Sequence, residues 1–156
     1  MTITVRTAVP ADLPVIMELE RAGFPAEEQW SETLWGQEIA GADRRVLLAD
    51  DDGAAGVMSI QVLPPSSDLM RIVVDPGRRR QGVATTLVRA GLDLAASEGA
   101  EAMMLEVRYD NDAAIACYGR AGFEQLTTRP NYYGAGKDAL VMRAWDLDRR
   151  KEGDHG

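Results

Sequence analysis

Apolar residues return with a helical period twice near the start of the chain, which predicts two helices. The first is expected to begin after Asp12, acting as its N-cap, and to run to about Arg21. The second is expected to begin at Ser31, again as an N-cap, and to end at Gly41. The chain therefore opens with two helices joined by a short loop.

The apolar pattern then changes to that of extended segments. Two apolar runs flank an Asp-Asp-Asp-Gly turn, which predicts a hairpin. Four further apolar runs predict strands, and two stretches with an apolar face predict helices. In chain order, these elements are strands at Arg45–Ala49, Ala54–Val62 and Leu69–Val74, a helix at Val83–Ser97, a strand at Ala102–Val107, a helix at Ala113–Ala121, and strands at Phe123–Thr128 and Ala139–Ala144.

This order of elements predicts the α/β (α+β) fold class, with a single mixed, mostly antiparallel central sheet and helices on both faces. The run Ala102–Val107 is almost wholly apolar, so we expect it to be a buried central strand. The sequence shows no internal repeat and no interdomain linker. We expect one domain over residues 1–145 and a charged, disordered tail over residues 146–156.

Composition narrows the possible chemistry. The 156 residues are 46% hydrophobic, enough for one domain with a core, and no apolar run reaches the length of a membrane span. A single cysteine, Cys117, fits a reducing cytoplasm, and a single histidine, His155, argues against Cys/His zinc sites and histidine-based triads. The net charge of −8 disfavours nucleic-acid binding and suits a basic protein or an amine as partner.

A basic loop, residues 78–84 (Arg-Arg-Arg-Gln-Gly-Val-Ala), joins an expected strand to an expected helix. The first turn of a helix presents unpaired N–H groups and a partial positive charge, so it binds anions such as phosphate. Gly82 allows the backbone to approach a phosphate, and the arginines add charge-assisted bonds. The alternative is that the arginines only solvate a loop. The loop is neither a dinucleotide fingerprint nor a P-loop.

The segment Arg79-x-x-Gly82-x-Ala84, after Ile72-Val73-Val74-Asp75-Pro76, resembles the coenzyme A loop of the GCN5-related N-acetyltransferase (GNAT) family. The resemblance covers Thr4 to about Trp145. It implies acetyl-coenzyme A as co-substrate, no metal, and a sheet splayed between the strands at Leu69–Val74 and Ala102–Val107, which would correspond to the fourth and fifth strands of the family's sheet. Pantetheine would pair with main-chain groups of the former, which would also steady an oxyanion. The implied donor-site residues are Ile72, Val73, Val74, Arg79, Arg80, Gln81, Gly82, Val83, Ala84 and Thr85.

Two side chains near this expected opening are candidates for acid–base chemistry. Glu106 lies at the end of an apolar strand, where an unpaired carboxylate is costly. In one interpretation it reaches water or pairs with Arg108 or Arg71. In the other it is a general base, because burial raises the pKa of a carboxylate. Tyr118 is either a core tyrosine or a proton donor, because a phenol with a pKa of about 10 stays protonated at pH 7.

The stretch from Leu105 to Phe123 resembles, more specifically, the RimI-like branch of the family, ribosomal-protein alanine N-acetyltransferases. The resemblance implies Glu106 as general base, Tyr118 as general acid and Asn111 as a coenzyme A contact, although Asn111 is also an ordinary helix N-cap. The later Asn131-Tyr132-Tyr133 resembles the substrate-side hairpin of the branch.

Aromatic residues are candidates for the acceptor side. Trp30, Tyr132 and Tyr133, and also Trp35, line an acceptor pocket in one interpretation and belong to an aromatic core or rim in the other. The chain departs from the branch on this side: Ala26–Gln29 separates a Phe-Pro pair from a Trp-Ser pair, and Pro130 replaces a second arginine.

The resulting hypothesis is transfer of an acetyl group to the N-terminal α-amino group of a protein, such as a ribosomal protein, in a ternary complex. An α-amino group has a pKa near 8 and lysine near 10.4, so a protein N-terminus needs less help to lose its proton. Two alternatives stay open: acetylation of a small amine (a polyamine, an amino-acid derivative or an antibiotic), and a non-catalytic coenzyme A-binding module.

Overall fold

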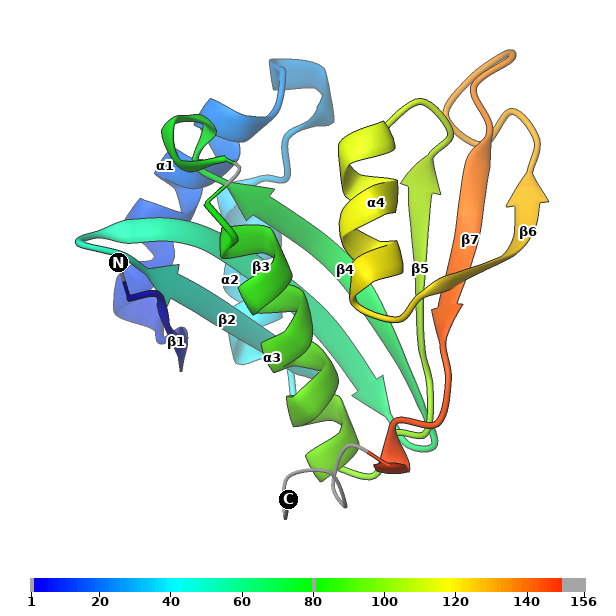
Figure 1. Ribbon diagram of the computed structural model, residues 1–156. Coiled ribbons are helices and arrows are strands. Elements are labelled where there is room, and N and C mark those ends of the chain that lie inside the picture. The colour runs from blue at the N-terminus through cyan, green and yellow to red at the C-terminus, as the bar shows by residue number, and fades with distance from the viewer. Residues whose placement is uncertain (1, 80, 150–156) are drawn as a thin grey trace. The chain divides into compact units, whose positions relative to one another are not determined.

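The computed structural model describes residues 2–79 and 81–149 (Figure 1). The longer helices are α1 (Leu13–Gly23), α2 (Glu32–Ala40), α3 (Val83–Ser97) and α4 (Asp112–Arg120), and the short 3₁₀ turns are η1 (Pro10–Asp12), η2 (Ala26–Glu28) and η3 (Pro76–Arg78). The strands are β1 (Thr4–Thr7), β2 (Arg44–Asp50), β3 (Ala54–Leu63), β4 (Ser66–Val74), β5 (Met103–Arg108), β6 (Glu124–Arg129) and β7 (Ala139–Ala144).

The strands form one sheet in the order β1-β2-β3-β4-β5-β7-β6. β1 with β2, β2 with β3, β5 with β7, and β6 with β7 are antiparallel. β4 and β5 form a parallel pair, with Asp68 opposite Met104. The mixed, mostly antiparallel sheet confirms the fold class expected from the sequence.

The chain divides into two compact units. The N-terminal unit contains Met1–Gln61 and Met70–Gly91, and the C-terminal unit contains Val62–Leu69 and Leu92–Gly156. Strand β4 contributes its first residues to the C-terminal unit and its last residues to the N-terminal unit.

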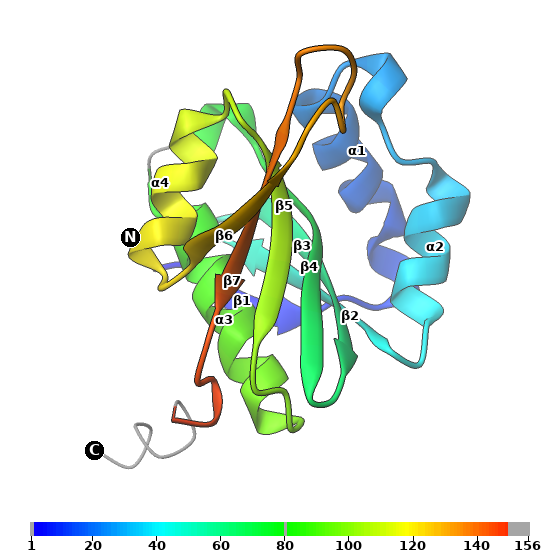
Figure 2. The same ribbon diagram turned by 90° about the vertical axis from the view of Figure 1, so that its right-hand side faces the viewer.

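In the N-terminal unit, helices cover both faces of the sheet (Figure 2). Successive residues of a strand point to opposite faces of the sheet. On one face, Val46 and Leu48 of β2 pack against α1 and α2. On the other face, Met58 and Ile60 of β3 pack against α3, where both lie within 4 Å of the position of a Cβ at Gly91. Burial on both faces explains the continuous apolar runs of β2 and β3. The core with α1 and α2 contains Ala8, Ile16, Met17, Leu19, Trp35, Val46, Leu48, Val57 and Val73.

In the C-terminal unit, β7 lies between β5 and β6. Along β5, Leu105 and Val107 are buried and alternate with Glu106 and Arg108, which are partly exposed. Every residue of β6 is exposed, and its pairing with β7 shifts register between Gln125 and Thr127. Helix α4 lies alongside this part of the sheet (Figure 2).

The N-terminal segment differs from the sequence-based expectation in two respects. The strand β1 was not expected; it has only four residues, nearly all exposed, so it carries no strong apolar pattern. The side chain of Asp12 does not cap α1 but accepts hydrogen bonds from the Val9 N–H (2.7 Å) and from Arg6 (both 2.9 Å). The hydrogen bonds from Arg6 lower the pKa of Asp12 to about 2, and they tie β1 to the start of α1.

The other boundaries differ by a few residues. The helix α1 ends at Gly23 rather than near Arg21, and β4 begins at Ser66, within the expected turn, because Ser67 is buried and its hydroxyl donates to the Ala102 carbonyl (2.8 Å). Helix α2 is capped by the Ser31 hydroxyl, as expected.

The segment expected to be a disordered tail begins in an ordered way. Leu147 is buried, and its N–H donates to the Glu101 carbonyl at 3.0 Å. The rest of that segment, from residue 150 onward, lies outside the described residues. No helix in the described part of the chain is long and apolar enough to cross a membrane.

Candidate active site

The expected phosphate loop lies between β4 and α3 in the N-terminal unit. Gly82 has a φ of +85°, which favours glycine, and its carbonyl accepts the Thr86 N–H (2.9 Å) and hydroxyl (2.7 Å) at the start of α3. Apart from Gly82 itself and its two chain neighbours, no described residue has an atom within 4 Å of the position that a Cβ would take at Gly82. The loop thus has space for an anion at the N-terminal end of a fifteen-residue helix.

The arginines of this loop differ in their roles. Arg78 turns inward: it donates to the carbonyls of Asp51 and Asp52 and forms an ion pair with Asp75 (3.6 Å). It therefore anchors the loop to the β2–β3 turn. This contact could not be predicted from the sequence, because Asp51 and Asp52 are distant from Arg78 in the chain. Arg79 follows at the end of η3, and Arg80 lies outside the described residues.

The end of β4 is the strand expected to bind pantetheine. Val73 is buried in the core with α1 and α2, so its neighbours Ile72 and Val74 point to the opposite face of the strand. A Cβ at Gly56 of β3 would lie 3.0 Å from the Val73 carbonyl oxygen, so β3 packs closely against this strand. The backbone of residues 72–74 is thereby held in a defined position.

In the C-terminal unit, Glu106 projects from the partly exposed side of β5. Its side chain is 29% exposed and its Oε1 is 3.4 Å from Nη1 of Arg129 on β6. The other carboxylate oxygen, Oε2, is buried and has no hydrogen-bond partner among the described residues. The sequence offered Arg71 or Arg108 as the partner; Arg71 instead pairs with Glu20 and Arg108 with Asp110. An oxygen that is buried and unpartnered in this way has capacity to accept a proton or a donor from a ligand.

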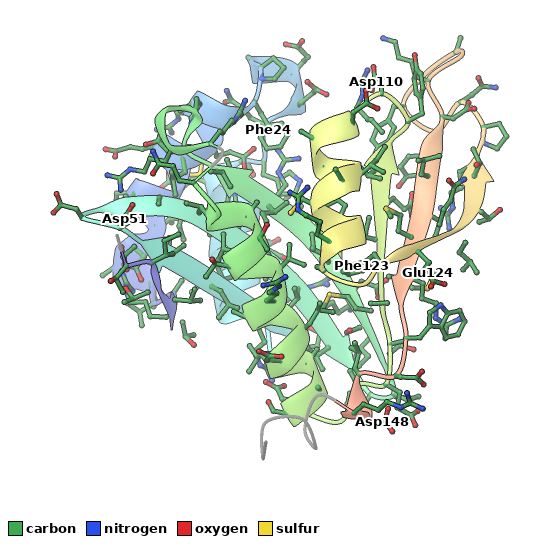
Figure 3. The ribbon with its side chains drawn as sticks, viewed as in Figure 1. Phe24, Asp51, Asp110, Phe123, Glu124 and Asp148 are labelled. Carbon is green, nitrogen blue, oxygen red and sulfur yellow. The ribbon has the colours of Figure 1, made fainter. Side chains whose placement is uncertain are left out.

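The phenol of Tyr118 lies in the same unit, on α4. Its side chain is only 7% exposed, and its ring packs 5.9 Å from that of Phe123, just after α4 (Figure 3). Burial raises the pKa of Tyr118 above its usual value of about 10, and Cys117 and Tyr133 add smaller effects in the same direction. A phenol in this environment keeps its proton. Cys117 is itself buried, in agreement with a packing role.

The remaining expected residues of this unit lie on α4 and on the β6–β7 connection. The carboxamide of Asn111 accepts the Ala114 N–H at 3.2 Å, so it is the N-cap of α4. The rings of Tyr132 and Tyr133 contact edge to face at 5.0 Å and are both exposed. Arg129 lies 5.6 Å from the centre of the Tyr132 ring, so one arginine contacts both Tyr132 and Glu106, and Arg108 lies 5.7 Å from the centre of the Tyr133 ring.

The two tryptophans of the N-terminal unit separate into different roles. Trp35 is fully buried, and its indole N–H donates to Glu20 at 2.9 Å, so it belongs to the core and not to an acceptor pocket. Trp30 is partly buried, with its ring 5.0 Å from that of Trp35. The segment Ala26–Gln29 before it includes the 3₁₀ turn η2. Glu20 and Arg71, which hold this region together, were not identified from the sequence.

Comparison with known proteins identifies the family. Residues 13–123 match the model of the Acetyltransferase (GNAT) family. The chain belongs to this family. The match includes the loop at Gly82, Glu106 and Tyr118, and it makes the protein an acetyl-coenzyme A-dependent N-acetyltransferase.

Named relatives within the family cover most of the chain. A ribosomal protein bS18-alanine N-acetyltransferase of Salmonella typhimurium is 34% identical over 145 residues, which is 89% of this chain and 95% of the relative. An uncharacterized protein of Mycobacterium leprae is 36% identical over 147 residues, but the chain spans only 40% of its length. The crystal structure of the ribosomal-protein-S18-alanine N-acetyltransferase from Escherichia coli has a TM-score of 0.84 and 30% identity, covering 93% of this chain and 94% of the other.

Proposed function

We propose that this GNAT acetyltransferase acetylates the N-terminal α-amino group of a protein, with a ribosomal protein as the preferred acceptor. The observation that carries the proposal is that one unit contains both a carboxylate with a buried oxygen that has no partner among the described residues (Glu106) and a buried, protonated phenol (Tyr118). The names of the Salmonella and Escherichia relatives support the choice of acceptor. The reaction would take place in the cytoplasm, where ribosomal proteins are made.

The mechanism we propose is direct attack in a ternary complex. Acetyl-coenzyme A, when bound, supplies an acetyl group activated as a thioester. Glu106 accepts the proton that the amine loses as its nitrogen bonds to the acetyl carbon. Tyr118 holds the proton that the sulfur takes as the carbon–sulfur bond breaks. Glu106 and Tyr118 then return to their starting protonation states by exchange with solvent.

The donor site we propose includes the loop at Gly82 and the start of α3, with Arg79 and Arg80 supplying charge and the backbone of residues 72–74 pairing with pantetheine. The open space at Gly82 and the helix N-terminus fit a pyrophosphate. The resemblance adds Gln81, Val83, Ala84 and Thr85 to this site. It separately implies that Asn111 contacts coenzyme A.

Replacing Gly82 with glutamate should weaken acetyl-coenzyme A binding at least tenfold, because a carboxylate would repel the phosphates and a side chain is strained at this φ. Thermal stabilisation by acetyl-coenzyme A, followed against its concentration, measures the effect. The matched control is Gly77→Glu, which adds the same charge in η3 without a positive φ. Equal stabilisation of the Gly82→Glu variant and the wild type would show that the phosphates bind elsewhere.

The acceptor preference follows from charge and pKa. A free α-amino group has a pKa near 8, so about a tenth is neutral at pH 7, whereas a lysine amine with a pKa of 10.4 is almost wholly protonated. A single carboxylate base therefore suits an N-terminus better than a lysine. The net charge of −8 also attracts a basic peptide.

Two matched peptides test the acceptor. One has a free N-terminus and no lysine, and the other has a blocked N-terminus and one internal lysine. We expect the first to be acetylated at least tenfold faster at pH 7, in line with the difference in neutral amine. Initial rates measured by mass spectrometry decide the outcome. Faster reaction of the lysine peptide, or turnover of a polyamine with neither peptide reacting, would contradict N-terminal acetylation.

A further inference from the structure

A fully buried carboxylate with no assigned role lies in the N-terminal unit. Glu20 of α1 is 0% exposed. Its oxygens accept the indole N–H of Trp35 (2.9 Å), the main-chain N–H of Trp30 (3.0 Å), and the guanidinium of Arg71. A buried charge needs such partners, because removing a carboxylate from water is costly unless it is paired and hydrogen-bonded. Glu20 therefore joins α1, the start of α2 and β4 at one point.

Arg71 completes the connection from the other side. Its guanidinium stacks 3.6 Å from the centre of the Phe24 ring and lies 5.1 Å from that of Trp30. One of its amino groups also donates to the main-chain carbonyl of Glu28, at 2.8 Å. A planar guanidinium can make these bonds and this stacking at once, whereas an ammonium cannot. Arg71 thus contacts the α1–α2 loop, residues 24–31, at three places along its length.

We propose that Arg71 is a positioning residue that fixes the α1–α2 loop, and with it the binding of the acceptor peptide. This proposal rests on the proposed function, because it assigns the loop to the acceptor. Phe24, Glu28 and Trp30 belong to a loop that leaves α1 at one end and enters α2 at the other. Between α1 and α2, this loop is held by Arg71, through its stacking on Phe24 and its bond to the Glu28 carbonyl, and by the Glu20 carboxylate, through its bond from the Trp30 N–H.

The place of Arg71 on β4 connects this loop to the reaction. Arg71 immediately precedes Ile72, where the proposed pantetheine strand begins, and the phosphate loop lies at the other end of that strand. If the phosphates bind at that loop and the pantetheine arm runs back along β4, the thioester end would lie toward Arg71. The end of α1 packs on the same segment, since a Cβ at Gly23 would lie 2.6 Å from Cγ1 of Val73. The loop that Arg71 holds would then border the reacting end of the donor.

The experiment compares Arg71→Lys with the wild type in two assays. Lysine keeps the charge beside Glu20 but loses the stacking and the bond to Glu28. We expect a glutamate-specific protease to cut at Glu27 and Glu28, both exposed, about tenfold faster. We also expect the KM for the acceptor peptide to rise about tenfold, with kcat and the Kd of acetyl-coenzyme A within about twofold of wild type.

Two further variants secure the interpretation. Phe24→Leu removes the aromatic surface on which Arg71 stacks but keeps an apolar side chain against the core, and it should move both assays in the same direction, by a smaller factor. Arg44→Lys is the matched control, because Arg44 forms another largely buried ion pair, with Glu38 at 3.3 Å, and this partner lies outside the α1–α2 loop. This control should behave as wild type in both assays.

The two proposals fail in distinguishable ways. The protease assay needs no acceptor, so wild-type cleavage rates in Arg71→Lys would overturn the role of Arg71 whatever the substrate is. A loss of acetyl-coenzyme A affinity as large as the change in KM would also overturn it, because Arg71 would then belong to the donor site. A faster protease cut in a protein that acetylates no peptide N-terminus would instead overturn the proposed function and leave Arg71 as the residue that holds the loop.

Discussion

Replacing Glu106 with glutamine is expected to lower kcat/KM for the acceptor peptide by about a hundredfold to ten-thousandfold at pH 7. Glutamine keeps the size of the side chain but cannot accept a proton from the amine. The carboxylate has one oxygen near Arg129 and one buried oxygen without a partner among the described residues. Because glutamine has the same size, the substitution removes the base without creating a cavity. The defect should shrink toward pH 9, because more of the acceptor amine is then already neutral.

The measurement is a pH–rate profile for the wild type and the variant, with the Kd of acetyl-coenzyme A determined separately. Glu124→Gln is the matched control: it removes a carboxylate from β6, on the exposed strand of the same unit (Figure 3). It should leave the profile unchanged. A Glu106→Gln variant with wild-type activity at pH 7 would remove Glu106 from the mechanism and leave positioning of the two substrates as the source of rate.

Replacing Tyr118 with phenylalanine is expected to lower kcat about a hundredfold while changing the Kd of acetyl-coenzyme A less than about twofold. The change deletes one hydroxyl from a ring that is otherwise buried against Phe123, so packing is retained. Because burial raises the pKa of Tyr118 above its usual value, the phenol keeps its proton across the range in which the protein works. The wild-type rate should therefore not fall between pH 8 and pH 10 through loss of this proton.

The control for this variant is Tyr109→Phe, an exposed tyrosine of the same unit, which should retain wild-type turnover. A thioester with a better leaving group than coenzyme A needs less help from a proton donor. We therefore expect it to recover part of the rate lost in Tyr118→Phe. Full activity of Tyr118→Phe with acetyl-coenzyme A itself would show that the thiolate leaves without a proton from this residue.

The sequence predicted those parts of the molecule that depend on neighbouring residues. The cap at Ser31, the helix that follows Gly82 and the apolar strand β5 each have their signal within a few positions, and each is present in the structure. The strand β1 has no such signal, because it is short and exposed. Asp12 had a local signal for a cap, but Arg6 and the Val9 N–H compete for its carboxylate.

Contacts between distant residues could not be predicted in the same way. Arg129 reaches Glu106 only because β6 and β7 pair with a shift in register after Gln125, and a one-residue change in pairing reverses the faces of a strand. The bond between Arg71 and Glu20 joins residues 51 positions apart. Apolar patterning identifies which faces are buried, but it does not identify which polar side chains meet there.

The anchoring of Arg78 has a consequence for how this chain tolerates change over evolution. Arg78 bonds to the carbonyl oxygens of Asp51 and Asp52, which any amino acid at those positions would also present. The Asp51 carboxylate adds an ion pair with Arg78 at 3.9 Å, but the main-chain bonds do not depend on either side chain. Both side chains can thus be exchanged with those bonds kept, provided that the replacement accepts the left-handed backbone of Asp52 (φ +55°). A single inserted or deleted residue in the β2–β3 turn would instead move both carbonyls away from the guanidinium. Homologous chains that keep an arginine at this position should vary in the identity of these turn residues but not in their number.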